Sequence, residues 1–176
     1  MAAATGGNII LDNVNTLNIT AIVSKLQEAG AELELAKNKI QIRASKRIKA
    51  VDIKTLPYPG FPTDMQSVFG ALLTTAKGTS VIVENIFENR YKYLNELKKM
   101  GAKVSIEGNI AIIKGVKRLH GADLDVTDLR GGAALCLSAL VARGESKIKN
   151  VEYILRGYQN FDKKLQKLNA NICLEK

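Results

Sequence analysis

The feature that most constrains the fold is a pattern that occurs three times along the chain. It is carried by the stretches "LQEAGAELEL" (26–35), "LKKMGAKVSI" (97–106) and "LQKLNANICL" (165–174). Each stretch is typical of the end of an amphipathic helix, a turn and an alternating strand. Gly30, Gly101 and Asn169 occupy the turns, and these residue types best tolerate the left-handed conformation that ends many helices. The repetition predicts a fold made of similar supersecondary units.

Two further sets of similar segments support this interpretation. The stretches "AAATGGNIILDNV", "LLTTAKGTSVIVENI" and "ALVARGESKIKNV" each predict a helix end, a glycine turn and a strand that ends at Asn13, Asn85 or Asn150. The motifs "TDMQ" at Thr63 and "TDLR" at Thr127 open only two of the units. The chain therefore begins inside a predicted helix, and we expect it to be one domain of a longer protein.

The predicted fold class is α/β, with repeated βαβ-like units, buried helices and outer sheets. We expect one domain over residues 1–176, built of about three repeats: 1–50 (partial), 51–115 and 116–176. The stretch "KVSIEGNIAIIKG", with its Gly108-Asn109 turn, predicts a β-hairpin within the second repeat.

The helices of one unit are expected to differ in burial. Tyr91, Leu94, Leu97 and Met100 recur every three residues, which predicts one apolar stripe on a surface helix. The segments 67–76 and 129–142 are instead apolar or small nearly all round. Such helices are predicted to be buried, and their glycines and alanines would let neighbours approach closely.

The charge and the aromatic content limit the classes of partner. A formal net charge of +9 favours anionic partners such as phosphorylated small molecules, although a solubilising surface explains it equally well. The 5 tyrosines and 4 phenylalanines do not interleave with a basic patch, so no nucleic-acid partner is expected. The longest apolar run, 131–142, is too short to span a bilayer, so no membrane partner is expected either.

Two unclustered cysteines, Cys136 and Cys173, form neither a metal-ligand pattern nor a disulfide framework. The sequence therefore predicts no metal and no other cofactor. A reducing cytosol fits this cysteine usage, and the first residues lack the pattern of a signal peptide.

Two acidic residues follow helix-start motifs. Thr63 is the predicted N-cap of one helix, with Gln66 as its capping-box partner, and Thr127 is the predicted N-cap of the later helix. Asp64 and Asp128 would then each stand at a first helical position. An acidic residue there stabilises a helix by ~0.3–1 kcal/mol through the macrodipole. Alternatively, the rigid lead-in "PYPGFP" positions Asp64 for chemistry.

Three arginines occupy comparable places. Arg90 and Arg156 are predicted to follow strands, and Arg130 stands two residues after Asp128. If they converge on one face, their guanidinium groups would suit carboxylate and phosphate. Ordinary exposed arginines also occupy such positions, so the pattern alone leaves both interpretations open.

These residues carry a family resemblance. The strings "PYPGFPTDMQ", "ENIFENRY", "LKKMGA", "TDLRGGAAL" and "LRGYQNFDKKL", in this order, resemble the later half of bacterial UDP-N-acetylglucosamine enolpyruvyl transferases. The likeness covers nearly all of residues 1–176. It implies two similar domains that close over the substrates, with this chain as the C-terminal half and a missing N-terminal catalytic domain as its partner. That other domain would supply the family's reactive loop cysteine, because Cys136 and Cys173 match non-catalytic positions.

The resemblance implies transfer of the enolpyruvyl group of phosphoenolpyruvate to the 3-hydroxyl of UDP-N-acetylglucosamine. This is the first committed step of peptidoglycan synthesis in the bacterial cytoplasm, and it links the protein to cell-wall biogenesis, cell shape, cell cycle and division. We expect this domain to be inactive alone. The alternatives are a nucleotide-sugar-binding module without turnover and a domain of the sister 5-enolpyruvylshikimate-3-phosphate synthase.

The resemblance also implies roles for individual residues. Asp64 would be the carboxylate at the sugar hydroxyl, with the Ile86 backbone and Phe87 near the nucleotide-sugar. Arg90, Arg130 and Arg156 would face phosphoenolpyruvate, and Asp128 would lie close to the reacting centre. The set of expected catalytic residues is thus Asp64, Asp128, Arg130 and Arg156, and the set of expected substrate-binding residues is Asp64, Ile86, Phe87, Arg90, Arg130 and Arg156.

Overall fold

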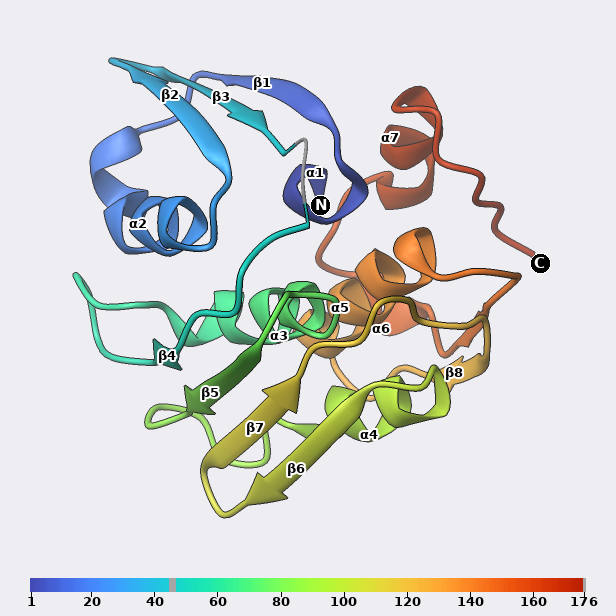
Figure 1. Cartoon of the computed structure of the whole chain (residues 1–176). Helices are drawn as coiled ribbons and strands as arrows, with labels where there is room; N and C mark the ends of the chain where they lie inside the picture. Colours follow the sequence, from blue (N-terminus) through green and yellow to red (C-terminus); the bar gives the residue numbers. More distant parts are fainter. Residues whose placement is uncertain (45–46, 176) are drawn as a thin grey trace.

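The computed structural model describes residues 1–44 and 47–175 and has the predicted α/β class (Figure 1). The elements in chain order are α1 (Ala2–Thr5), β1 (Asn8–Asp12), the 3₁₀ helix η1 (Thr16–Ile19), α2 (Thr20–Glu28), β2 (Glu32–Ala36), β3 (Lys39–Arg43), β4 (Ile53–Lys54), α3 (Thr63–Leu73), β5 (Thr79–Val83), α4 (Lys92–Lys99), β6 (Lys103–Glu107), β7 (Ile110–Lys114), β8 (Asp123–Asp125), α5 (Leu129–Val141), β9 (Lys147–Lys149), α6 (Glu152–Leu155) and α7 (Phe161–Lys167).

Three sheets are formed within the described residues. One has the strand order β1-β3-β2 and is antiparallel, one has the order β4-β5-β7-β6, and β8 pairs with β9. The pairs β4–β5 and β8–β9 are parallel, and each is connected through a buried helix, α3 or α5. These are βαβ units, as expected, because a parallel pair needs a long crossover between its strands.

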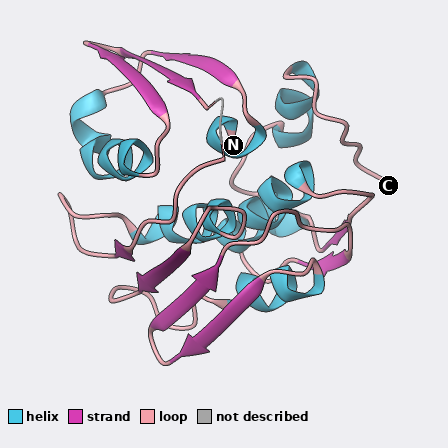
Figure 2. Cartoon of the chain, viewed as in Figure 1, coloured by secondary structure: helices cyan, strands magenta, loops and turns pink. Residues whose placement is uncertain are grey.

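Helices α3 and α5 lie side by side in the interior, with strands on either side of the helical layer (Figures 1 and 2). Glycines of these two helices let α4 and α6 pack closely against them. A Cβ on Gly70 would collide with the Tyr93 hydroxyl, and a Cβ on Gly132 would lie 2.6 Å from the Ile154 side chain. The largest fully buried side chains are Tyr93, Ile40, Ile53, Leu73, Ile82, Leu94, Leu97, Met100, Ile113, Leu119, Leu124 and Leu135, and all of them except Ile40 belong to one core cluster.

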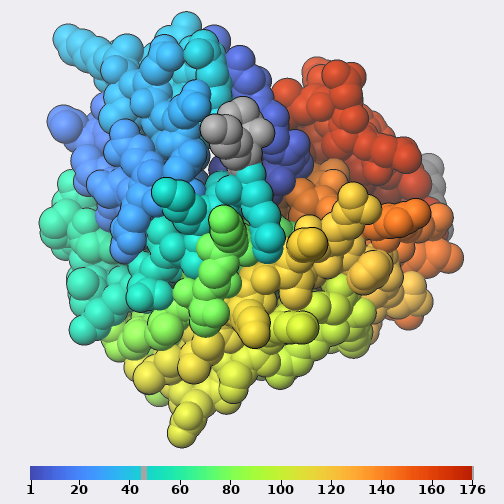
Figure 3. Space-filling view, in the orientation of Figure 1, coloured from blue at the N-terminus to red at the C-terminus, as the bar shows by residue number. Residues whose placement is uncertain are grey.

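The space-filling view separates two parts of the surface (Figure 3). In this orientation the blue amino-terminal surface and the green-to-yellow surface of the four-stranded sheet lie at opposite ends of the molecule.

The apolar stripe predicted for α4 is confirmed, because Tyr91, Leu94, Leu97 and Met100 are all buried. The predicted hairpin is confirmed as β6 and β7, in which Glu107 pairs with Ile110.

The predicted left-handed turns are confirmed, whereas the strand expected after the third turn is wrong. Gly30, Gly101 and Asn169 have φ values of 92°, 89° and 64°. Strands follow the first two, but residues 171–175 form none. In the first two cases a second strand returns and pairs with the first, whereas residues 171–175 pair with no strand of the described residues. An extended segment without a pairing partner leaves its backbone groups to other contacts.

The N-cap predictions are also wrong, and the two acidic residues turn out to differ. Pro62 precedes α3 as its cap residue, and Thr63 is the first helical residue, with its hydroxyl donating to Glu84 instead. For α5 the cap is Asp128 itself, whose carboxylate accepts from two backbone N–H groups of the first turn. Thr127 is therefore not the cap, because α5 begins at Leu129 and the residue directly before it, Asp128, accepts from those donors.

Candidate active site

The centre of the candidate site is the Asp64 carboxylate, which stands in the first turn of α3 between two arginines. Arg90 donates from Nη2 to one carboxylate oxygen at 2.8 Å, and Arg130 donates from Nη2 to the other at 2.6 Å. The Asp64 side chain is 55% exposed, whereas that of Arg90 is only 7% exposed. Residues far apart in the sequence thus meet at one accessible carboxylate.

The two arginines hold Asp64 in its charged form. The hydrogen bond from Arg130 is the main cause that lowers the pKa of Asp64 below its ordinary value, and the charges of Arg130 and Arg90 act in the same direction. Partial burial opposes this effect. In return, the hydrogen bond from Asp64 is the main cause that raises the pKa of Arg130. At neutral pH the cluster therefore holds one anion and two cations, with a net positive charge suited to a further anion.

Arg130 is fixed from two further sides. Its Nη1 atom donates to the Tyr158 hydroxyl at 3.1 Å, and its guanidinium carbon lies 5.8 Å from the Tyr158 ring centre. Its backbone N–H donates to Asp128 at 3.0 Å, as does that of Gly131 at 2.8 Å. Asp128 thus orders the start of α5, the segment that carries Arg130.

Arg90 lines a hollow of about 610 Å³ that the loop after β5 borders. Ile86 and Phe87 project from this loop with 46% and 56% of their surface exposed. The Arg90 guanidinium carbon lies 4.5 Å from the centre of the Phe87 ring, within the range of a cation–π contact. The Arg90 Nε atom is buried and has no hydrogen-bond partner in the described part of the chain. The hollow is therefore lined by a mixture of apolar, amide and charged side chains, with Lys92 as a second cation beside Arg90.

Arg156 contacts Tyr153, whereas the arginines that bond to Asp64 are Arg90 and Arg130. It follows α6 and not a strand, and its guanidinium carbon lies 5.4 Å from the Tyr153 ring centre. The next residue, Gly157, packs against the Leu129 side chain at the start of α5. Of the three arginines singled out from the sequence, the structure brings two onto Asp64 and leaves the third on a neighbouring segment.

Two residues that the sequence interpretation missed belong to this arrangement. Glu84 is buried at the end of β5, and Tyr158 supports Arg130. A carboxylate that ends the apolar run "SVIV" was a usable signal for Glu84, because buried acidic residues need partners. Tyr158 had no signal, since its contact with Arg130 spans 28 positions.

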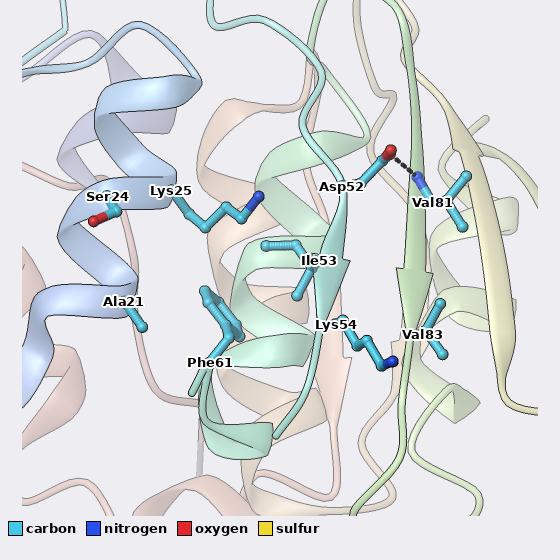
Figure 4. Close-up of a pocket in the computed structure, with 9 residues that line it drawn as sticks. All are labelled: Ala21, Ser24, Lys25, Asp52, Ile53, Lys54, Phe61, Val81 and Val83. Carbon is cyan, nitrogen blue, oxygen red and sulfur yellow. Dashed lines mark hydrogen bonds between the residues drawn. The ribbon is translucent and has the colours of Figure 1, made fainter. Parts of the chain in front are cut away.

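Another hollow, of about 640 Å³, lies between α2 and the strands β4 and β5 (Figure 4). Phe61, Ile53 and two valines form much of its wall, and Lys25 reaches toward it from α2 (Figure 4). Asp52 at its rim accepts a hydrogen bond from the backbone of Val81 at 2.7 Å. Its lining is mainly apolar and its cations, Lys25 and Lys54, are lysines, which lack the bidentate fork of the arginines in the Asp64 cluster.

The remaining candidate nucleophiles lie outside the cluster. Burial raises the pKa of the Cys136 thiol to about 12, so the thiol stays protonated at neutral pH. Cys173 is exposed. Among residues 1–44 and 47–175 there is no group of three histidine, cysteine or acidic side chains that could hold a metal ion. The helices of the same residues include none long and apolar enough to cross a membrane.

The fold is that of an enolpyruvyl transferase. The chain aligns with the crystal structure of the enolpyruvyl transferase NikO from Streptomyces tendae at a TM-score of 0.85, with 23% identity over 93% of this chain and 39% of that one. It also aligns with the EPSP synthase from Acinetobacter baumannii at a TM-score of 0.60, with 16% identity over 84% of this chain and 36% of that one. Both likenesses define the class of fold.

Sequence comparison gives the family. Residues 1–165 match the family EPSP synthase (3-phosphoshikimate 1-carboxyvinyltransferase). The UDP-N-acetylglucosamine 1-carboxyvinyltransferase of Desulfofundulus thermocisternus is 53% identical over 97% of this chain and 70% of its own length. A relative of the same name from Caldanaerobacter subterraneus is 48% identical over 97% of this chain, which spans only 41% of that relative. The chain belongs to the enolpyruvyl transferase family, and these relatives are its UDP-N-acetylglucosamine members.

Proposed function

We propose that this chain forms the C-terminal domain of an enzyme that transfers the enolpyruvyl group of phosphoenolpyruvate to the 3-hydroxyl of UDP-N-acetylglucosamine. The observation that carries the proposal is the exposed Asp64 carboxylate between Arg90 and Arg130, beside the hollow bordered by Ile86 and Phe87. The names of the relatives support this choice of substrates over 3-phosphoshikimate. The reaction would be the first committed step of peptidoglycan synthesis in the bacterial cytoplasm.

The proposed substrates match the charges of the cluster. Phosphoenolpyruvate carries a carboxylate and a phosphate, and each guanidinium group offers several N–H donors for such anions. Arg90 and Arg130 each use one terminal nitrogen on Asp64, which leaves other donors for the substrate. Arg156 would join them when the substrates bind, because the segment around it packs on the start of α5. Asp128 would act by fixing that helix start close to the reacting centre.

Asp64 would orient the sugar hydroxyl and accept its proton. In the substrate-free state its lowered pKa makes it a weak base. Phosphoenolpyruvate would draw the two guanidinium groups toward its own anionic groups, and enclosure of the site would remove water from the carboxylate. Both changes raise the pKa of a carboxyl group, so basicity at Asp64 would develop only with the substrates in place.

A second half of the site would come from another domain. The chain spans 41% of the length of the Caldanaerobacter relative, and we propose that the remaining length supplies a domain that closes over the substrates and completes the catalytic machinery. The chain alone would then bind weakly and turn over nothing.

The test compares this chain with a chimera in which it replaces the matching segment of the Caldanaerobacter relative. Phosphate release from phosphoenolpyruvate in the presence of UDP-N-acetylglucosamine should stay at background for the chain alone and should be restored in the chimera. Turnover by the chain alone would contradict the proposed domain organisation. A folded chimera that lacks activity would contradict the proposed function.

A further inference from the structure

Glu84 is a buried carboxylate with an unusually complete set of hydrogen-bond donors. It is only 4% exposed. The Thr55 hydroxyl donates to Oε1 at 2.7 Å, and the backbone N–H groups of Ile86 and Phe87 donate to the same oxygen at 2.9 and 3.0 Å. The Thr63 hydroxyl donates to Oε2 at 2.9 Å. Four donors from the described part of the chain thus hydrogen-bond to the two oxygens of this group.

The direction of the hydrogen bond from Thr55 to Glu84 follows from a second contact of the Thr55 hydroxyl. The Thr55 oxygen accepts from the backbone N–H of Asn85 at 2.8 Å, so its own proton is free to point to Glu84. The Asn85 side-chain amide donates to the Thr55 carbonyl at 3.2 Å. The loop that begins at Glu84 is thus attached to the segment after β4 at successive residues.

The same carboxylate connects this loop to the candidate catalytic group. Thr63 directly precedes Asp64 at the start of α3, and its hydroxyl is one of the four donors to Glu84. Arg90 makes a second connection, since it pairs with Asp64 and stacks on Phe87. The far end of the loop is held by the Tyr91 hydroxyl, which lies 2.9 Å from the carbonyl oxygens of both Ile82 and Asn109. The Ile86–Phe87 loop is therefore connected to the start of α3 in two ways, through Glu84 and through Arg90.

We infer that Glu84 is a positioning residue that sets the Ile86–Phe87 loop at a fixed place relative to Asp64. Only 4% of its surface is exposed and its oxygens are engaged by the loop and by Thr63, so it acts through the loop and the helix start. The inference rests on the proposed function where it assigns the loop to the nucleotide-sugar. Its structural part, the rigid connection between the loop and the start of α3, is independent of any ligand.

The first experiment measures amide hydrogen exchange by NMR in this chain without ligand. Glu84→Ala should speed the exchange of the Ile86 and Phe87 amides by at least tenfold, because both lose their acceptor. Glu84→Gln keeps an oxygen for those amides, and the Thr63 hydroxyl can turn to accept from the new amide group, so exchange should stay within about threefold of the parent. Unchanged exchange in folded Glu84→Ala would overturn the inference.

Two further variants serve as a control and as a substitute for Glu84→Ala. Asp52→Ala removes another carboxylate that accepts from a backbone N–H, that of Val81, and should leave the Ile86 and Phe87 amides unaffected. If Glu84→Ala does not fold, Glu84→Asp retains the charge but shortens the side chain, so it cannot reach both Thr63 and the loop. It should speed exchange of the loop amides at least fivefold, and parent-like exchange would overturn the inference.

The second experiment titrates UDP-N-acetylglucosamine into the same proteins and follows the same two amides. The parent should show shifts at Ile86 and Phe87, Glu84→Ala should bind at least tenfold more weakly, and Glu84→Gln and Asp52→Ala should bind like the parent. If the parent shows no shifts at millimolar ligand, the assignment of this loop to the nucleotide-sugar fails, while the exchange result still decides the positioning role. Equal binding by the parent and Glu84→Ala would overturn that role in recognition.

Discussion

Gly70 of α3 lies against Tyr93 of α4, and this contact gives a prediction about the stability of the fold. Replacement of Gly70 by alanine adds a methyl group that would collide with the hydroxyl of Tyr93. Alanine is favoured over glycine in a helix interior by about 1 kcal/mol. Overpacking of a buried site costs about 1–3 kcal/mol, and Tyr93 is 1% exposed, so it cannot swing into solvent. We expect Gly70→Ala to lower the free energy of unfolding by a net amount of up to about 2 kcal/mol.

The cause can be isolated by removing the hydroxyl. The Tyr93 oxygen is buried and has no hydrogen-bond partner in the described residues, so Tyr93→Phe should change stability between zero and a gain of about 1 kcal/mol. In the double variant the nearest atoms to the new methyl are the Tyr93 ring carbon Cζ at 3.1 Å and Ile82 Cδ1 at 3.4 Å. Most of the collision is then gone, and the helix preference for alanine remains.

Urea unfolding followed by circular dichroism measures all four proteins of this double-mutant cycle. The double variant should be at least as stable as the parent, with a coupling free energy of about 1–2 kcal/mol between the two sites. Coupling within about 0.5 kcal/mol of zero would refute the reasoning, because the two changes would then act independently.

Three further predictions concern charge and packing. Arg130→Met should raise the pKa of Asp64 toward its ordinary value, as measured by ¹³C NMR titration, and an unchanged pKa would contradict the cause assigned here. In the parent, the stability that the ion pair adds is present above the unfolded-state pKa of the carboxyl group and is lost as the pH falls through the lowered folded-state pKa. Arg47→Met removes the donors to three carbonyl oxygens at 2.6–2.8 Å, those of Thr75, Ala76 and Val116, and should lower the free energy of unfolding by about 1–2 kcal/mol in urea. Arg43→Met, which breaks an exposed ion pair, should cost less than about 1 kcal/mol, and equal costs would show that the three carbonyl contacts of Arg47 add no stability. Leu94→Ala should cost about 2–5 kcal/mol by the same assay, since Leu94 is fully buried, and a loss below about 1 kcal/mol would show that the site collapses around the cavity.

Local periodicity was sufficient to predict the apolar stripe of α4 and the β6–β7 hairpin. The stripe on α4 could be predicted because one face of that helix is apolar at regular spacing. The burial of Tyr93 could not, since it depends on glycines of α3 and α5 that lie next to it only after folding. The strand expected near Leu174 failed for a related reason, because strand formation depends on a partner and the repeat pattern reports only on local sequence.

The candidate site shows the same limit more strongly. Helix-start motifs pointed to Asp64 and to Arg130, but these residues are 66 positions apart and their ion pair is a property of the packed helices. The position of Glu84 at the end of an apolar run is visible in the sequence, but its hydrogen-bond donors are not, because they come from three separate segments. Sequence spacing predicts which element carries a group, whereas the convergence of groups is decided by packing.

The contrast between the two helix-start aspartates bears on what Asp64 is for. Asp128 satisfies two backbone N–H groups of α5, so helix capping alone accounts for an acidic residue there. Asp64 accepts no such bond from the residues that the structure describes, and both its oxygens are held by arginines while more than half of its side chain stays exposed. An exposed ion pair contributes little stability, about 0–1 kcal/mol, and a helix start that needs only negative charge does not require two arginines from elsewhere in the fold. The arrangement therefore favours a carboxylate kept accessible and oriented over one that serves the helix. A chimera with Asp64→Asn should fold and lose turnover by about 10²-fold or more, and turnover within a few-fold of the parent would return Asp64 to a purely structural role.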